Sequence, residues 1–242
     1  MKKKYTSDLL YIRDHKVDLK SPKIMGILNL TKDSFYDGGK YNTLKKCLLQ
    51  CEKMINEGAH FIDIGVHSSK PGSKIINSND EIKLLIPYLE KILKEFNDFY
   101  FSIDTYNSEV AKISIEMGVS IINDISAGSL DNKMLSLLAK HRLPYVVMHM
   151  KGIPASMQKN PEYRNVTKEI IDFFDKKINQ VKNKGIKNII VDPGFGFGKN
   201  ELHNYELLRN LSDLKIFNYP ILVGVSRKSM IYNKLNILPE FA

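Results

Sequence analysis

The sequence predicts an α/β protein of the (β/α)8 barrel class, and three observations carry that prediction. Short β-branched runs alternate with amphipathic helical segments along most of the 242 residues. The runs are continuously apolar, which is typical of strands buried on both faces of a parallel sheet. Polar residues gather at the carboxyl ends of these runs, where a barrel builds its active site.

Seven segments are predicted to be strands, because each is a short run of β-branched or aromatic residues followed by a turn signal. They are residues 23–29, 60–65, 99–104, 120–124, 144–149, 188–192 and 220–225. Three segments between them place apolar residues at helical spacing. These predicted helices are residues 43–57, 80–96 and 166–184.

The residues after 225 are enough for one helix over 226–235 and a short tail. We therefore expect a barrel with only seven βα strands evident and a missing C-terminal unit. We expect one domain over residues 1–242, with residues 1–20 as an N-terminal extension. An open doubly wound sheet is the alternative, but there only the strand ends near its switch point would converge. Seven polar strand ends favour the closed ring.

The formal charge of +9 comes from lysine, with 31 Lys against 5 Arg. A basic balance can indicate a nucleic-acid partner. Here the lysines are spread along the chain, and no segment interleaves arginine with aromatic residues. Lys, Ile and Asn share A/T-rich codons, so the 28 Ile and 20 Asn point to base composition as the source of the charge. We expect no nucleic-acid partner.

The composition also predicts a cytoplasmic protein without a membrane partner. No stretch approaches 18 consecutive apolar residues, and residues 1–16 lack the apolar core of a signal peptide. The two cysteines, Cys47 and Cys51, lie on the apolar stripe of a predicted helix. We expect them to be core residues in a reducing compartment.

The segment Asp192-Pro-Gly-Phe-Gly-Phe-Gly-Lys199 closes the sixth predicted strand. Its glycine spacing fits neither a phosphate-binding loop nor a dinucleotide fingerprint. We interpret it as a tight turn against which a flat ligand can lie. Asp192 could accept two hydrogen bonds from an amino-pyrimidine edge, and without such a partner its burial would be costly.

Two other strand ends suit an anion. Ser226, Arg227 and Lys228 stand at the start of a predicted helix, where free N–H groups and cations favour phosphate. Capping by serine with two solvated cations is the alternative. The first run leads into a long polar loop, and its Asn29 is a hard oxygen ligand suited to Mg²⁺ held with a phosphate. A plain surface loop is the alternative there.

Together these motifs resemble the dihydropteroate synthases, a family of pterin-binding barrels. The matching stretches, in the family's order and spacing, are residues 25–39, 63–72, 102–105, 121–125, 148–152 with 157–158, 192–199 and 224–231. The resemblance implies a transferase of folate biosynthesis. Such an enzyme joins 6-hydroxymethyl-7,8-dihydropterin diphosphate to 4-aminobenzoate and releases 7,8-dihydropteroate and diphosphate.

The resemblance also assigns roles by matching position. The residues implied to hold the pterin edge are Asp104, Asn123, Asp192 and Lys228, and all but Asn123 are also expected to be catalytic. Ile125 and Met148 would lie against the pterin ring, and Asn29 would bind the expected cofactor, Mg²⁺. The residues implied for the aminobenzoate and diphosphate sites are Phe35, Ser69, Lys70, Pro71, Phe197, Arg227 and Ser229.

The match ends at residues 238–242, before the family's eighth strand and the Arg-x-His pair on it. This leaves open a truncated relative that binds pterin without turnover. A pterin-binding methyltransferase domain is a further alternative, although it needs neither a diphosphate nor an aminobenzoate pocket. A homodimer stays open too, but the family's interface uses the last helix, so part of it is expected to be missing.

Overall fold

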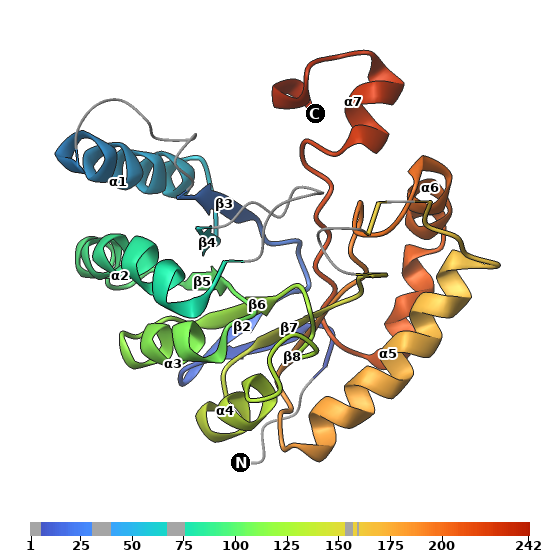
Figure 1. Ribbon diagram of the computed structural model, residues 1–242, viewed down its shortest axis with the longest axis horizontal. Coiled ribbons are helices and arrows are strands. Elements are labelled where there is room, and N and C mark those ends of the chain that lie inside the picture. The colour runs from blue at the N-terminus through green and yellow to red at the C-terminus, as the bar shows by residue number, and fades with distance from the viewer. Residues whose placement is uncertain (1–5, 31–39, 67–75, 153–156, 159) are drawn as a thin grey trace.

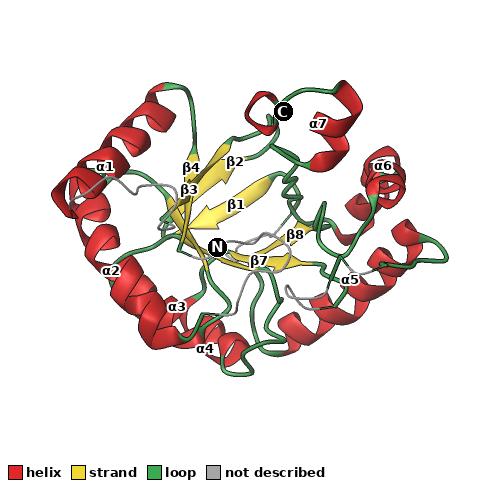
Figure 2. Ribbon diagram, turned by 45° about the horizontal axis from the view of Figure 1, so that its top comes forward, coloured by secondary structure: helices red, strands yellow, loops and turns green. Residues whose placement is uncertain are grey.

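The computed structural model describes residues 6–30, 40–66, 76–152, 157–158 and 160–242, without the side chains of 40–43. Its centre is a sheet of parallel strands in the chain order β3-β4-β5-β6-β7-β8. These strands are β3 (Met25–Asn29), β4 (Phe61–Gly65), β5 (Phe101–Asp104), β6 (Ile121–Asp124), β7 (Tyr145–Met148) and β8 (Ile189–Asp192). The sheet curves around a common interior with helices outside it, which confirms the α/β barrel class (Figures 1 and 2).

The outer layer is formed by helices in the connections between strands. They are α1 (Lys40–Asn56), α2 (Ser78–Glu95), α3 (Ser108–Glu116), α4 (Met134–His141), α5 (Val166–Asn183), α6 (Glu201–Arg209) and α7 (Ser229–Leu235), with 3-10 helices η1 (Leu211–Phe217) and η2 (Pro239–Phe241). The three helices predicted from apolar spacing are confirmed within three residues at each end. Asn77 and Asn165 start α2 and α5 by accepting hydrogen bonds from backbone N–H groups one turn later.

The seventh predicted strand is wrong in its extent. Within the described residues, the run 220–225 pairs with β8 only around Ile221, through hydrogen bonds from Val191 N to Pro220 O and from Leu222 N to Val191 O, both 2.8 Å. Pro220 has no N–H to extend this ladder. The following helix begins at Ser229 instead of 226, because Arg227 has a left-handed φ of 56°.

The inward face of the sheet changes from apolar to polar within two residues. In their amino-terminal halves, four strands carry the clustered residues Phe61, Ile121, Val146 and Ile190. Two residues further along, three of these strands carry the polar residues Asp63, Asn123 and Asp192, and the fourth carries Met148. Because strand side chains alternate between faces, these later residues share the interior with the first set.

Residues 1–20 were predicted to be an extension, but the described part of this segment is a hairpin packed under the sheet. It consists of β1 (Leu9–Ile12) and β2 (His15–Asp18), paired antiparallel. Leu10 and Ile12 are buried in the same cluster as the amino-terminal strand residues. The Asn188 side chain donates to Tyr11 O, and Arg13 Nη2 donates to Gly118 O at 2.7 Å. The hairpin thus lies across the interior of the ring, against the amino-terminal strand residues (Figure 2). The assignment of the whole chain to one domain stays a prediction.

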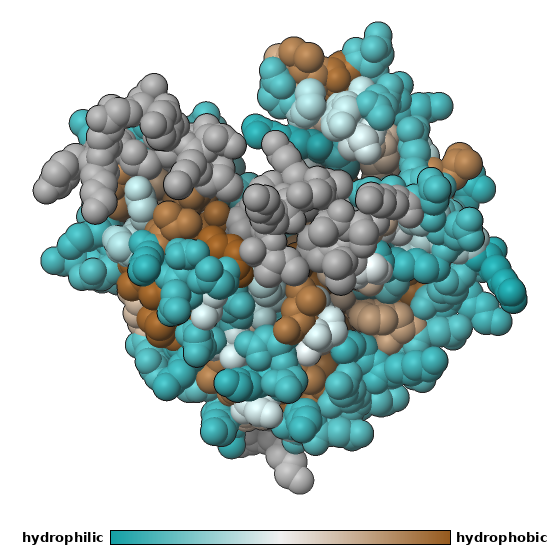
Figure 3. All heavy atoms as spheres, viewed as in Figure 1, coloured by the Kyte–Doolittle hydropathy of each residue, from teal (hydrophilic) through white to brown (hydrophobic). Residues whose placement is uncertain are grey.

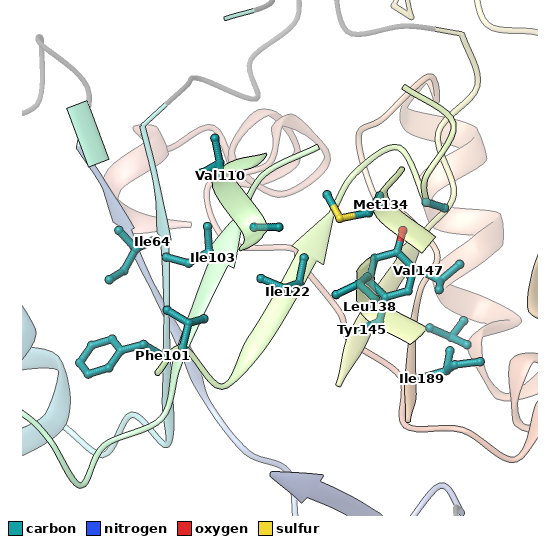
Figure 4. Packing of buried hydrophobic residues seen from close by; sticks show 14 of the residues in the cluster. Ile64, Phe101, Ile103, Val110, Ile122, Met134, Leu138, Tyr145, Val147 and Ile189 are labelled. Atoms are coloured by element: carbon teal, nitrogen blue, oxygen red, sulfur yellow. The ribbon is translucent and has the colours of Figure 1, made fainter. Parts of the chain in front are cut away.

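The outward-facing strand residues form the main core with the helices. Figure 4 shows part of this core, with labelled residues from five strands and from α3 and α4. Cys47 and Cys51 of α1 are fully buried in it as free thiols, and burial raises the pKa of each to about 12. The prediction that both are core residues is confirmed.

The C-terminal segment packs on the barrel through few residues. Met230 of α7 is buried, and its carbonyl accepts a hydrogen bond from the Tyr205 hydroxyl of α6. Leu235, Leu238 and Phe241 are mostly exposed, and hydrophobic side chains show at this end of the molecule in Figure 3. Among the described helices, none is long and apolar enough to cross a membrane.

One strand-end carboxylate serves the fold. Asp124 is fully buried; Oδ1 accepts from Ser126 N and Oγ, and Oδ2 accepts from Gly128 N and the Tyr145 hydroxyl at 2.9 Å. These bonds oppose the rise that burial causes in the pKa of Asp124. They fix the turn between β6 and α4.

We expect Tyr145→Phe to lower the free energy of unfolding by about 1–3 kcal/mol, because it leaves a buried carboxylate oxygen short of a donor. Chemical denaturation measures this. Tyr232→Phe is the control, since Tyr232 is half-buried on α7 with no hydroxyl partner among the described residues. It should change stability by less than about 0.5 kcal/mol. Equal effects of the two substitutions would contradict the role given to Tyr145.

Candidate functional site

The predicted polar strand ends meet in the upper interior of the barrel. The strand register places Asp63 beside Ser102, Asp104 beside Asn123, and Met148 beside Asp192. Asn29 lies beside Gly65 at the ends of β3 and β4. The structure therefore brings together the predicted residues Asn29, Asp104, Asn123, Met148 and Asp192.

The centre of this layer is rich in acceptors. Asn123 Nδ2 donates to Asp63 Oδ2 at 2.8 Å. In this layer of the described structure, three other buried acceptor oxygens find no hydrogen-bond donor: Asp63 Oδ1, Asp104 Oδ1 and Asn123 Oδ1. Ser102 Oγ, beside Asp63 on the neighbouring strand, is also unpaired, and Ser102 acts to lower the pKa of Asp63. Buried polar atoms are nearly always paired, so three unpaired acceptors on adjacent strands indicate a ligand that brings N–H groups.

Crowded carboxylates shift one another's titration. Burial, followed by the charges of Asp63 and Glu81 and two further carboxylates, raises the pKa of Asp104 well above its usual value. Burial likewise raises the pKa of Asp192 to about 6, while Gly194 N and the cations Lys228 and Lys199 act to lower it. Both shifts favour the protonated form in the free protein. Holding negative charge here therefore costs desolvation free energy, which a donor ligand would offset.

The glycine turn after β8 forms one side of the site. Gly194, Gly196 and Gly198 all have positive φ, between 62° and 80°. A β-carbon on Gly194 would lie 2.0 Å from His149 O, so the backbone of this turn lies directly on the end of β7. Gly194 N donates to Asp192 Oδ1 at 2.7 Å, which orients the carboxylate.

Side chains from three segments hold the same turn. Asn204 Oδ1 of α6 accepts from Gly196 N at 2.9 Å, and the Gln158 amide donates to Gly196 O. The Tyr163 hydroxyl donates to Gly198 O at 2.9 Å. The prediction of a tight turn is confirmed, and its shape is fixed by tertiary contacts.

Lys228 lies close to Asp192 without pairing to it. Its Nζ stands 4.6 Å from the centre of the Phe197 ring. Burial lowers the pKa of Lys228, and the charge of Asp192 opposes that effect. No direct ion pair joins the two residues in the part of the chain that the structure describes. The Lys228 ammonium and the Asp192 carboxylate are thus both available to a ligand that carries an acceptor as well as donors.

An apolar wall completes the site. The buried residues that pack together here are Tyr106, Ile125, Met148, Met157 and Phe197. Three of them were predicted, Ile125 and Met148 for a ring and Phe197 for the neighbouring pocket. A flat aromatic ligand with a polar edge would bury its faces against this wall and its edge among the carboxylates.

Asn29 was predicted to hold Mg²⁺. A β-carbon on Gly65 would stand 3.8 Å from Asn29 Oδ1 and 3.5 Å from Asp104 Oδ2, so both oxygens border the same space above that glycine. Among the described residues no three His, Cys, Asp or Glu form a metal site. Mg²⁺ often keeps several water ligands and binds substrate phosphate oxygens, so that it needs few ligands from the protein. A single amide oxygen, that of Asn29, fits this kind of site.

Of the remaining predicted residues, the structure describes two, and it does not bring these two into the interior. Phe35, Ser69, Lys70 and Pro71 lie outside the described residues. Arg227 and Ser229 are exposed near the C-terminal segment, where Arg227 N donates to Ala242 O at 2.9 Å. Lys228, not a serine, stands at the N-cap position of α7, so capping by Ser226 is wrong.

The sequence reasoning assigned no role to four residues that the structure places in or under the site. Asp63 could have been found, because it falls at the same inward position as Asn123 and Asp192 when the strands are aligned. Tyr106 and Met157 follow strands in loops, where no periodicity marks them. Lys199 ends a glycine-rich turn and reads as a surface residue, but it is 3 % exposed.

Comparisons with known proteins match this geometry. The model of the pterin binding enzyme family matches residues 25–240. A dihydropteroate synthase of Haemophilus influenzae is 43% identical over 224 residues, covering 92% of this chain and 81% of its own length. A structure of the Yersinia pestis dihydropteroate synthase in complex with a sulfonamide drug has a TM-score of 0.89 and 40% identity, covering 96% and 85% of the two chains.

A second solved structure is the Xanthomonas albilineans dihydropteroate synthase with 4-aminobenzoic acid. It has a TM-score of 0.88 and 33% identity, and the match covers 98% of this chain and 85% of that one. These similarities extend over the whole described barrel, including the strand ends and the glycine turn. The chain belongs to the dihydropteroate synthase family of pterin-binding enzymes.

Proposed function

We propose that this protein joins 6-hydroxymethyl-7,8-dihydropterin diphosphate to 4-aminobenzoate at the carboxyl ends of its strands, forming 7,8-dihydropteroate and diphosphate in folate biosynthesis. The observation that carries the proposal is the set of buried, unpaired acceptors on Asp63, Asp104 and Asn123 beside Asp192. A pterin edge brings amino and ring N–H donors to such acceptors, and charge-assisted bonds of this kind are strong.

The pterin would lie with its edge among the carboxylates and its faces against Ile125, Met148 and Phe197. Its ring carbonyl needs a cation, and Lys228 is near Asp192 without pairing to it. The Gly194 N–H keeps Asp192 oriented in the free protein. Binding would then satisfy the oxygens that the fold leaves unpaired, with little rearrangement of the strands.

The reaction would be a substitution in which the C–O bond to diphosphate breaks early. Positive charge that develops on the pterin methylene and ring would be stabilised by the surrounding carboxylates, including Asp104 and Asp192. The aminobenzoate amine is neutral at pH 7, so it can attack without a strong base. Positioning and electrostatics thus account for most of the expected rate enhancement.

Asn29 is the residue proposed to hold Mg²⁺. The ion would neutralise the leaving diphosphate when bound. The space that Asn29 and Asp104 share above Gly65 supports this assignment. We also propose the expected aminobenzoate and diphosphate sites, formed by Phe35, Ser69, Lys70 and Pro71 with Phe197, Arg227 and Ser229. Its support is the position of Phe197 beside Lys228.

A cytoplasmic location and assembly into a homodimer are further proposals. Two buried free thiols, Cys47 and Cys51, support a reducing compartment. For the dimer, the support is the family itself together with the exposed apolar residues of the α7–η2 segment.

The function is tested by diphosphate release from purified protein given the pterin diphosphate, 4-aminobenzoate and Mg²⁺. We expect release that requires all three. Asp192→Asn keeps the acceptor for Gly194 N but loses the charge, so kcat/KM should fall about 100-fold. Asp175→Asn, an exposed carboxylate on α5, is the control. Unchanged turnover in Asp192→Asn would overturn the assignment of that residue.

Pterin affinity should decrease as the pH falls. The pKa of Asp192 is raised to about 6, mainly by burial. As the pH falls through 6 the carboxylate gains a proton and loses its acceptor charge, so the association constant should drop by up to about tenfold per pH unit. Calorimetric titration with 6-hydroxymethyl-7,8-dihydropterin from pH 5 to 8 measures this. Affinity that rises on acidification would contradict an ionised Asp192.

Gly194→Ala should weaken pterin binding by at least about tenfold, because a β-carbon there meets His149 O in a left-handed conformation. Gly185→Ala is the matched control: its φ is 92°, but nothing lies within 4 Å of the new atom. It shares the backbone strain without the collision, and should leave pterin affinity unchanged. Equal losses of affinity would show that strain alone, and not the close approach at the site, causes the effect.

A further inference from the structure

We propose that Lys199 is a positioning residue of the pterin site: its ammonium group, enclosed by the glycine turn and His149, holds Asp192 and Phe197 where they meet the pterin. This inference rests on the proposed function, since it takes Asp192 and Phe197 as pterin contacts. It assigns a role to a buried lysine that makes no direct contact in the proposed reaction.

The contacts of Lys199 use all of its donors. Nζ lies 2.8 Å from Gly194 O, 3.1 Å from Phe197 O and 3.0 Å from His149 Nδ1. His149 O lies farther away, at 3.5 Å. An ammonium group has three N–H donors and no acceptor, so the three nearer acceptors are enough to satisfy it. A surface lysine would keep its head in water, whereas this residue is 3 % exposed.

His149 must act as an acceptor in this arrangement. With Nδ1 accepting from Lys199, the neutral ring carries its proton on Nε2. Burial and then the positive charges of Lys199 and Lys151 lower the pKa of His149 to about 2, which agrees with a ring that stays neutral. The ring is fixed by an edge-to-face contact with Phe173 of α5, with ring centres 4.9 Å apart.

The same ammonium group joins both ends of the turn. Gly194 N donates to Asp192 Oδ1, and Gly194 O accepts from Lys199 Nζ. By holding Gly194, Lys199 therefore also holds the orientation of the Asp192 carboxylate. Phe197 offers its carbonyl to Lys199 and its ring to Lys228. Loss of Lys199 would therefore free the carboxylate and the aromatic wall at once.

The charge of Lys199 also acts on Asp192 through space. The charged groups that face Asp192 are Lys199 on the turn, Lys228 before α7, Asp63 on β4 and Asp104 on β5. The charged or titratable groups around Lys199 are Asp192, Lys228, His149 and His203. Burial lowers the pKa of Lys199 to about 7, with Asp192 opposing and Lys228 adding to this effect, so the ammonium form prevails below pH 7, where the pH profile of binding is followed. Both lysines favour the ionised carboxylate and both aspartates oppose it. Removing Lys199 should thus make pterin binding fail at a higher pH, an effect that a purely mechanical role would not produce.

The test compares full-length variants by titration with 6-hydroxymethyl-7,8-dihydropterin at several pH values. Lys199→Met removes the charge and the donors while keeping the length. We expect Kd at pH 6.5 to rise about tenfold or more, and the midpoint of the pH profile to move upward. Lys182→Met makes the same charge change on an exposed site in the last turn of α5, and should alter neither quantity.

A second pair keeps the lysine, in case Lys199→Met does not fold. His149→Asn can place an amide oxygen near the position of Nδ1, and His149→Leu cannot. Both lose the contact with Phe173. Tighter pterin binding by the Asn variant than by the Leu variant supports the acceptor role of His149 toward Lys199, and equal binding overturns it.

These experiments distinguish a failure of the proposed function from a failure of the role given to Lys199. If the wild-type protein does not bind the pterin, or Asp192→Asn binds it as well as wild type does, the proposed function fails first. If those two behave as expected while Lys199→Met keeps the wild-type Kd and pH midpoint, only the inference is overturned. A raised Kd with an unmoved midpoint would also overturn the part in which Lys199 acts through the charge of Asp192.

Discussion

The site depends on a change of character along the inward face of the sheet. The same strands that pack Phe61, Ile121 and Ile190 against the hairpin carry Asp63, Asn123 and Asp192 two residues later. A strand repeats every two residues, so apolar floor and polar site are locked in one register. A slip of one residue would send the carboxylates into the helix-covered core. The hairpin that seals the floor therefore also secures the position of the chemistry above it.

The glycine turn shows how tertiary contacts convert a flexible sequence into a rigid surface. Three glycines give the backbone access to left-handed conformations, and that freedom would be costly to restrict without partners. Here Lys199, Asn204, Gln158 and Tyr163 each bind a backbone group of the turn. Lys199 ends the turn itself, whereas Gln158, Tyr163 and Asn204 come from other segments of the chain. The turn is thus ordered only when the barrel has formed, and it keeps Asp192 aimed before any ligand arrives.

The features that could be predicted from the sequence are the strands, from their apolar runs, and the polar residues at the strand ends. Continuous apolar runs marked β3 to β8, and the strand-end rule marked Asp104, Asn123 and Asp192 correctly as neighbours. It could not separate Asp124, which looks the same in sequence but binds Tyr145, Ser126 and Gly128 in a turn. It missed the hairpin because its short strands become stable only against the strand ends they cover. Lys199 was missed for the same kind of reason: its three acceptors are neighbours only in the folded turn.

The electrostatics of the site favour ligand binding at some cost to the free fold. Asp192 has a folded pKa of about 6, above the 3.8 of an exposed aspartate, so the folded chain binds protons more tightly than the unfolded one. Its contribution to stability is therefore greatest below pH 3.8 and declines as the pH rises through 6. Near neutrality the ionised group opposes folding, and Lys199, Lys228 and Gly194 N offset only part of that. A pterin edge supplies the missing donors. The carboxylate cluster therefore favours ligands that donate at several points.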